Sequence, residues 1–305
     1  MDPTESAAPR YRGMDGWPVH DTVTALWAGQ MTAAAACLAV LPVLTAAVED
    51  ATRRLTGTAG RLIYAGAGSA GLVAVLDALD LGDTFDWPDD RLSILLAGGL
   101  DLARGLAAEI EDDAGSGRAR LGDLAVGPDD VVIGVSASGR SAFTVAIVEA
   151  ARRRGASTIG VTSIAGSPLT GAVLHPIVVA TGAEVIAGST RMGAGTAQKI
   201  VLNLFSTAVM IGLGRVYDNL MVNVRPRNAK LRRRCAAIVA QIAGVDEARA
   251  SAALARHGAV KNAVLGLAGA PAEDIPGLLA RAGGNLRHAL AAAGLTVGAA
   301  VIDPG

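Results

Sequence analysis

The first two thirds of the chain alternate short apolar runs with longer segments of helical periodicity. Apolar runs of strand length occur at 61–68, 91–99, 129–140, 157–163 and 175–181. Hydrophobic residues three and four positions apart predict helices at 21–57, 69–79, 101–113, 141–155 and 193–217. Strands that alternate with helices favour a parallel sheet covered on both faces. The pattern therefore predicts an α/β fold, a doubly wound parallel sheet in three α/β/α layers.

The pattern changes near residue 228, after which only helical spacing remains. Short helices that end at glycines predict a small C-terminal helical bundle. We therefore expect a loose leader at 1–20, an α/β domain with N-terminal helices at 21–227, and a helical subdomain at 228–305.

An acidic ladder follows the second predicted helix, with one aspartate at every third position. Its members are Asp77, Asp80, Asp83 and Asp86. Gly82 and Pro88 are expected to end the helix, which would leave the ladder in a loop. The spacing does not match a calcium-binding loop. We expect Asp77 at the helix end, and Asp83 and Asp86 in solvent.

Composition narrows the function classes. Hydrophobic residues make up 51% of the chain but aromatic residues only 3%, and the formal net charge is −1. Such a chain offers neither a basic surface nor stacking platforms for nucleic acid. Cys37 and Cys235 lack metal-ligand spacing, and buried free thiols are typical of a reducing compartment. The first eleven residues are polar, unlike a signal peptide, so we expect a cytoplasmic protein.

One uncharged stretch is long enough to span a bilayer. No charged residue stands between Asp21 and Glu49. The stretch consists mostly of alanine and threonine and carries a central Pro42, and alanine contributes little transfer free energy. A buried pair of helices in a soluble protein is therefore favoured over a membrane span.

Two Ser/Gly-rich loops, each between a predicted strand and a helix, are the main chemical signal. The first, GAGSAG at 66–71, matches the dinucleotide pattern, but the next strand ends in AGG about 30 residues on, without the acidic residue that pattern requires. The second is SASGRS at 136–141. Amides, helix N-termini and hydroxyls at one sheet edge can hold a phosphate. Helix capping by Ser69, Ser138 and Ser141 is the alternative, and it is compatible with binding.

Several stretches resemble one family. The paired loops resemble the sugar isomerase (SIS) fold of phosphosugar-binding proteins. The segments AGG at 97–99, EDD at 111–113, ASGRS at 137–141 and above all 182–231 are similar to the N-acetylmuramic acid 6-phosphate etherases, a family that also includes the repeated module of glucokinase regulatory protein. The resemblance runs from about residue 15 to 295 and implies a phosphorylated amino sugar as substrate.

The resemblance implies a reaction. These etherases cleave the lactyl ether at C3 of N-acetylmuramic acid 6-phosphate and release N-acetylglucosamine 6-phosphate and D-lactate. A base removes the C2 proton of the open-chain aldehyde, an acid assists the departure of lactate, and water then adds. The family needs no cofactor or metal. Its members form homodimers, for which the apolar helices at 21–48 and 200–214 could supply the surface.

Two carboxyl groups carry this chemistry in the family. The proton donor corresponds to Asp80 and the base to Glu111, the first residue of the EDD run. Asp80 is one methylene shorter than the family's glutamate, which sets its carboxyl back by roughly 1–1.5 Å and can cost on the order of 100-fold in rate. Without the resemblance, the EDD run would be interpreted as a solvated helix end.

The substrate-binding residues are also assigned by the resemblance and by the two loops. They are Gly68, Ser69, Ser138, Gly139, Arg140, Ser141, Glu184, Ser189, Thr190, Arg191 and Lys199. Arg191 and Lys199 are candidates for recognising phosphate or carboxylate, or alternatively structural braces. Glu184 could reach sugar hydroxyls or hold its own loop. The four histidines, which show no spacing signal, are expected to be structural or superficial.

The chain departs from the family near the expected site. Ala70 and Leu72 replace a serine and an arginine, Ala108 replaces a glutamate, Gly82 and Asp83 replace two prolines, and Gly193 replaces a lysine. These changes leave two alternatives to an active etherase open. One is a phosphosugar-binding regulatory protein with little catalysis, and the other is a phosphosugar isomerase.

Overall fold

The computed structural model describes residues 2–99, 108–224 and 228–298, and the chain divides into two compact units. Met1–Leu79 and Asp89–Thr207 form the first, here called the α/β unit, and Asp80–Pro88 and Ala208–Gly305 form the second, the helical unit. This division differs from the expected boundary at 227/228, because the hairpin at 216–221 belongs to the helical unit.

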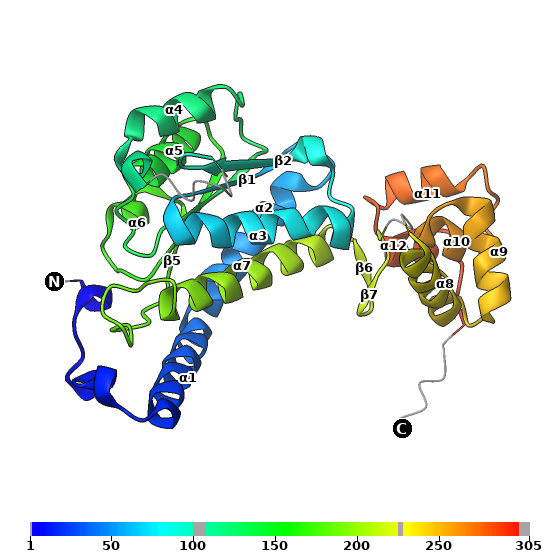
Figure 1. Cartoon of the computed structure of the whole chain (residues 1–305). Helices are drawn as coiled ribbons and strands as arrows, with labels where there is room; N and C mark the ends of the chain where they lie inside the picture. The colour runs from blue at the N-terminus through cyan, green and yellow to red at the C-terminus, as the bar shows by residue number, and fades with distance from the viewer. Residues whose placement is uncertain (1, 100–107, 225–227, 299–305) are drawn as a thin grey trace. The chain divides into compact units, whose positions relative to one another are not determined.

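Five parallel strands form the sheet of the α/β unit (Figure 1). They are β1 (Leu62–Gly66), β2 (Leu92–Leu96), β3 (Val131–Val135), β4 (Ser157–Thr162) and β5 (His175–Val178), in the order β2-β1-β3-β4-β5. Strands β1, β3 and β4 are buried throughout, as expected of strands covered on both faces. The predicted doubly wound parallel sheet is confirmed.

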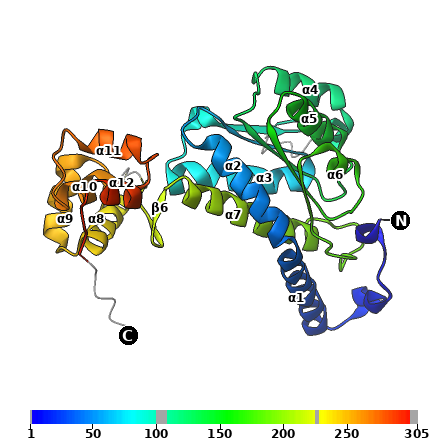
Figure 2. The same ribbon diagram turned by 180° about the vertical axis from the view of Figure 1, so that it is seen from behind.

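Helices cover both faces of this sheet (Figures 1 and 2). One layer contains α4 (Ala114–Gly122), α5 (Ala142–Arg153) and α6 (Pro168–Ala172), and the other contains α2 (Leu41–Leu55), α3 (Gly68–Phe85) and α7 (Gly193–Gly212). Alternate β1 residues separate the layers. Ile63 joins a cluster with Phe143 and Ile147 of α5, whereas Tyr64 donates a hydrogen bond to Asp77 of α3.

Helix α3 is longer than the sequence pattern predicts. It continues through Gly82 to Phe85, so the expectation that the acidic ladder is a loop was wrong. One glycine inside a helix costs only about 1 kcal/mol relative to alanine. The helix stops one residue before Asp86, whose φ of 55° is left-handed.

The N-terminal helical region is interrupted as the sequence predicts. Helix α1 (Val19–Ala36) passes through a 3₁₀ turn, Cys37–Val40, into α2, and Pro42 occupies the first turn of α2, where no amide donor is needed. Val19–Leu55 and α7 are each long and apolar enough to cross a membrane, a test that core helices of soluble proteins also pass. The expectation of a buried helix pair was wrong for α1, in which Ala33 is the one buried residue, whereas α2 buries five residues.

The residues before α1 are packed and differ from the expected loose leader. They form 3₁₀ turns at Pro3–Glu5, Pro9–Tyr11 and Met14–Gly16. Thr4 is 1% exposed, and its carbonyl accepts a hydrogen bond from the Gly188 amide.

The helical unit has its own core. A short antiparallel hairpin, β6 (Val216–Tyr217) and β7 (Leu220–Met221), precedes five helices. They are α8 (Ala229–Ala243), α9 (Glu247–His257), α10 (Val260–Leu267), α11 (Ile275–Arg281) and α12 (Leu286–Ala292). Buried residues such as Val239, Val264 and Leu290 form one hydrophobic cluster. The predicted helical bundle is confirmed.

Candidate functional site

The first glycine-rich loop joins β1 to α3 at the carboxyl edge of the sheet. A Cβ atom on Gly71 would lie 2.4 Å from Leu96 Cδ1 and 2.9 Å from the Gly66 carbonyl carbon. Gly66 and Gly71 therefore permit close packing of helix on strand. Gly68, with φ of 55°, starts the helix, and Ser69 is exposed in its first turn.

The second loop, between β3 and α5, is held by its own serines. Ser136 Oγ accepts from the Gly139 amide at 3.1 Å, and Ser138 Oγ accepts from the Arg140 amide at 3.2 Å. Ser141 caps α5 by accepting from the Thr144 amide at 3.3 Å, so the capping interpretation of Ser141 is confirmed. These bonds fix the loop before any ligand binds.

Glu111 contacts both loops, with its carboxyl group beside the first and its backbone carbonyl beside the second. Glu111 belongs to a 3₁₀ turn, Ala108–Asp112, and its Oε2 is 3.9 Å from the position that a Cβ of Gly68 would occupy. The Ser141 hydroxyl is 3.4 Å from the carbonyl oxygen of Glu111. Burial, and secondly the charge of Asp112, raise the pKa of Glu111. The helix predicted at 101–113 is thus a 3₁₀ turn at 108–112, and 101–107 lie outside the described residues.

Asp80 does not join this group within one chain. It is exposed on α3, twelve residues after Gly68, which corresponds to about 18 Å along a helix. An acid and a base acting on adjacent carbons must each come within about 3 Å of their protons. Along α3, Asp80 is therefore too far from the loop that Glu111 contacts.

Asp77 is buried within α3 and does not lie at a helix end, where the sequence pattern placed it. It is 1% exposed and accepts hydrogen bonds from Tyr64 Oη at 3.0 Å, Asn203 Nδ2 at 2.6 Å and Ser206 Oγ at 3.3 Å. Burial raises its pKa, whereas these donors and the charge of Lys199 act in the opposite direction. Asp77 thus ties α3 to β1 and α7. Its place on the buried face of α3, beside Ala78, was the signal in the sequence.

Glu184 holds the start of α7. It is 4% exposed, and its Oε2 and Oε1 accept from the amides of Gly193 at 2.8 Å and Ala194 at 2.9 Å. These are two of the amides that a helix N-terminus leaves without intrahelical partners. The geometry matches the loop-holding alternative for Glu184.

The remaining predicted residues lie around the N-terminal segment and α7. Ser189 and Thr190 are half-buried in the loop before α7, and Lys199 is half-buried on α7. The exposed Arg191 lines a cavity of about 630 Å³ with Tyr11, Asp15 and Trp17. Arg140 forms an ion pair with Asp2, Nε to Oδ2 at 3.1 Å. An anion that uses Arg140 must compete with this carboxylate.

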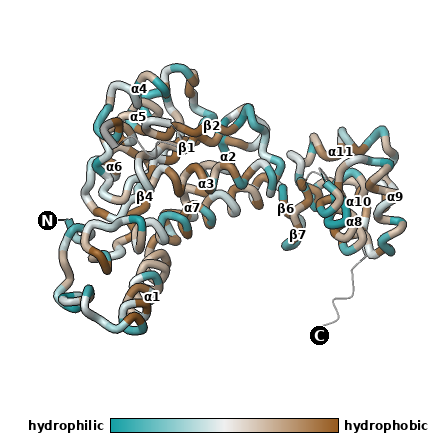
Figure 3. The backbone as a smooth tube through the Cα atoms, in the orientation of Figure 1, coloured by the Kyte–Doolittle hydropathy of each residue, from teal (hydrophilic) through white to brown (hydrophobic). Residues whose placement is uncertain are grey.

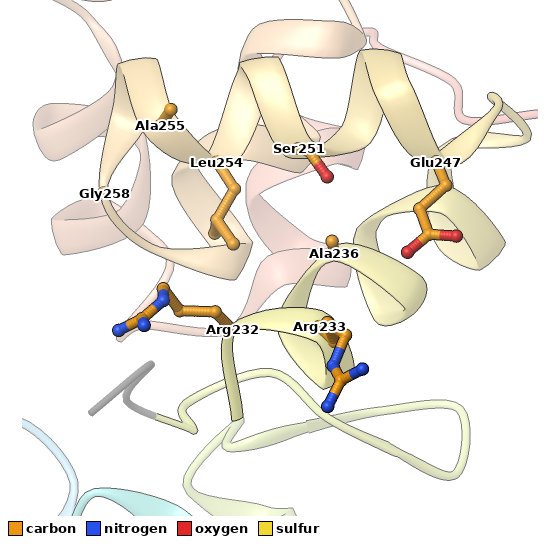
Figure 4. Close-up of a pocket in the computed structure, with 8 residues that line it drawn as sticks. All are labelled: Arg232, Arg233, Ala236, Glu247, Ser251, Leu254, Ala255 and Gly258. Atoms are coloured by element: carbon orange, nitrogen blue, oxygen red, sulfur yellow. The ribbon is translucent and has the colours of Figure 1, made fainter. Parts of the chain in front are cut away.

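A separate cavity of about 410 Å³ lies in the helical unit between α8 and α9 (Figure 4). Arg232 and Arg233 stand on one side, and Glu247 and Ser251 on the other. None of the residues predicted from the sequence lines it.

Comparisons with known proteins agree on one family. Residues 56–163 match the family model of the SIS domain. An N-acetylmuramic acid 6-phosphate etherase of Deinococcus radiodurans is 42% identical over 289 residues, covering 94% of each chain. The etherase of Streptomyces coelicolor is 44% identical and covers 95% of this chain and 94% of its own.

The solved structures show the same fold. A protein of Bacteroides fragilis, assigned as a phosphosugar isomerase involved in capsule formation, superposes with a TM-score of 0.50 at 20% identity. The match covers 66% of this chain and 95% of that protein.

Proposed function

Because the chain belongs to the N-acetylmuramic acid 6-phosphate etherase family, we propose that it is a carbon–oxygen lyase that cleaves the C3 lactyl ether of N-acetylmuramic acid 6-phosphate. The products are N-acetylglucosamine 6-phosphate and D-lactate. The observation that carries the proposal is the position of Glu111, whose carboxyl lies beside the first loop and whose main chain adjoins Ser141 of the second. The reaction belongs to amino sugar metabolism and peptidoglycan recycling in the cytoplasm.

The base in this mechanism is Glu111. The substrate phosphate binds the amides and hydroxyls of the two loops, and the open-chain aldehyde acidifies the C2 proton. Glu111 takes that proton, the C3–O bond breaks, and the lactate oxygen receives a proton from an acid. Water then adds its hydroxyl to C3 and a proton returns to C2. The raised pKa of Glu111 makes it a stronger base than an ordinary carboxylate.

The acid, in this proposal, is Asp80 of a second copy of the chain. Leu72, Leu76 and Leu79 make an exposed apolar stripe on α3 that continues to Asp80. Exposed apolar residues also occur on α1 and α7, where they include Trp27, Met31, Leu204 and Ile211. Figure 3 colours the backbone of these helices by hydropathy.

This assignment requires a twofold axis that relates two copies of the chain. An axis perpendicular to α3 near Leu76 would pair two copies of α3 antiparallel. Asp80 would then lie opposite the partner's Leu72, one helical turn from the partner's Gly68 and hence near the partner's Glu111. We therefore propose a homodimer with two shared sites.

The reaction is tested with N-acetylmuramic acid 6-phosphate in deuterated water. Release of D-lactate with deuterium at C2 supports the etherase. Deuterium exchange without lactate release would indicate that Glu111 works but that no acid reaches the ether oxygen. If neither occurs and the sugar phosphate still raises the melting temperature, the protein is a binding protein and the etherase proposal is wrong.

The sharing of sites is tested by mixing two inactive variants, Glu111→Gln and Asp80→Asn. In mixed dimers, one of the two sites combines an intact Glu111 with an intact Asp80. Random exchange of subunits should restore about one quarter of the wild-type activity if sites are shared across a twofold axis. No recovery after verified exchange would exclude Asp80 acting on the partner's site. Sedimentation velocity of the wild type measures the dimer independently.

A further inference from the structure

A second cleft of about 290 Å³ lies within the helical unit and takes no part in the proposed reaction. Asp86, Asn223, Lys261, Asn262 and Gly284 are among the residues that line it. Asn223 follows the hairpin and Lys261 is the second residue of α10, so residues distant in sequence meet around this space. The volume suits a small molecule.

Lys261 is a buried cation without an acidic partner in the part of the chain that the structure describes. It is 8% exposed, and its ammonium group donates to the Gly284 carbonyl. Burial, and secondly the charge of Arg215, lower its pKa to about 8. A buried charge is costly unless it is paired, and Lys261 lines the cleft with two ammonium hydrogens that the Gly284 carbonyl does not use, which favours an anion there.

Arg215 adds a second positive charge near Lys261. Its Nη1 donates to the carbonyls of Phe85 at 2.7 Å and Asp86 at 2.6 Å, and its guanidinium carbon is 5.0 Å from the centroid of the Trp87 ring. These contacts hold the guanidinium in place, close enough to Lys261 to affect its pKa.

Asn223 supplies an acceptor. Its Oδ1 atom is buried without a hydrogen-bond partner among the described residues. Buried polar atoms of this kind are nearly always paired in folded proteins. The atom that satisfies Oδ1 must carry a hydrogen, as a hydroxyl group does.

We propose that this cleft binds a small hydroxylated anion, with Lys261 contacting its anionic oxygens and Asn223 accepting a hydrogen bond from its hydroxyl group. Hydroxycarboxylates and sugar phosphates share this chemistry. If the proposed reaction is correct, both of its products belong to the class, and the cleft is then a product-binding site separate from the two loops of the α/β unit.

Isothermal titration of the full-length protein tests the proposal with D-lactate, N-acetylglucosamine 6-phosphate and sulfate as probes. The first two separate the two sources of the anion, and sulfate is an anion without a hydroxyl group. At least one hydroxylated probe should bind the helical unit, and Lys261→Met should weaken that binding at least tenfold. Lys230→Met, which removes an exposed lysine of α8, is the matched control and should leave binding unchanged.

A second variant separates the Lys261 contact from the Asn223 contact. It also tests the proposal if Lys261→Met does not fold. Asn223→Leu should weaken binding of the hydroxylated probe but not of sulfate. In wild type at pH 8.5, binding should also take up protons, seen as different heats in Tris and HEPES, because an anion beside Lys261 raises its pKa.

Three results would overturn the proposal: no probe binding at about 10 mM, which means a binding free energy weaker than about 2.7 kcal/mol; equal binding by wild type and Lys261→Met; or loss of binding only when Ser138 and Ser141 are replaced. The binding readout needs no turnover and can be repeated in Glu111→Gln. Failure of the etherase proposal and failure of this one are therefore distinguishable.

Discussion

The two edges of the sheet hold carboxylates whose pKa values are shifted in opposite directions. At the amino edge, Asp50 accepts hydrogen bonds from Ser157 Oγ at 2.6 Å and Arg54 Nε at 3.1 Å, and its Oδ2 lies 3.3 Å from His175 Nε2. Burial acts against ionisation, but these donors lower its pKa to about 2. At the carboxyl edge, the pKa of Glu111 is raised.

The direction of the pKa shift distinguishes carboxylates that stabilise the fold from the proposed catalytic carboxylate. Asp130 repeats the pattern of the amino edge, since Arg61 Nη2 lies 2.8 Å from its Oδ2 and its pKa is lowered despite burial. A carboxylate satisfied by donors is a poor base, whereas a half-buried carboxylate beside a like charge is a better one. In parallel α/β sheets, ligands bind at the carboxyl edge, which is where Glu111 lies.

The largest expected effect comes from removing the carboxylate of Glu111, the proposed base. Glu111→Gln should lower lactate release and C2 exchange by about 10³-fold, within the usual range for a general base. Folding should not suffer, because the raised pKa means that the ionised carboxyl is disfavoured in the folded state at neutral pH. Kinetic assays and a melting curve measured on the same sample check both statements. A large loss of stability would show that Glu111 belongs with the structural carboxylates.

Lengthening the side chain of Asp80, the proposed acid, should raise activity. Asp80→Glu should raise the turnover number, by up to about 100-fold if the missing methylene is the defect. Asp83→Glu, one turn further along the same helix, is the matched control and should have little effect. Equal rates for wild type and Asp80→Glu would remove the short side chain as an explanation.

At the amino edge, the expected effect is on stability. Asp50→Asn should lower the free energy of unfolding by about 2 kcal/mol, the equivalent of the lowered pKa. Turnover per folded molecule should remain within a factor of about two, because no reacting group is changed. Chemical denaturation and active-site titration provide the two numbers. Unchanged stability would mean that the Asp50 cluster contributes no net energy.

The pH dependence of stability and of activity should also distinguish Asp50 from Glu111, although this effect is smaller. Because the folded-state pKa of Asp50 is about 2 and its ordinary value is 3.8, its contribution is present above pH 4 and lost as the pH falls towards 2. Glu111 has the opposite sign, and any stability that its protonation gives is lost as the pH rises through its raised pKa. Activity should fall on the acid side as Glu111 becomes protonated. Stability and rate measured across the same pH series test the separation, and an acid limb retained in Glu111→Gln would assign it to another group.

Much of the fold could be predicted from local pattern, because buried parallel strands require continuous apolar runs. The length of α3 could not, since Gly82 carries only a modest helical cost that packing overrides. That length decides the geometry of the site, because it moves Asp80 away from the loop beside Glu111. Lys261 was also missed, because a charge says nothing of its burial until helices from distant parts of the sequence pack around it. Asp77 was missed although its helical spacing from Ala74 and Leu81 placed it on the buried face of α3.

The glycine pair at the start of α3 has a consequence for how such motifs are interpreted. Gly66 and Gly71 set the spacing between a strand and a helix, and any side chain at 71 would act as a wedge against Leu96 and the Gly66 backbone. A glycine motif that is usually interpreted as a nucleotide contact here allows the backbones of β1 and α3 to pack closely. A methyl group at position 71 would push away the start of α3, whose first turn carries Ser69, so the width of the proposed phosphate site depends on the packing of these two glycines.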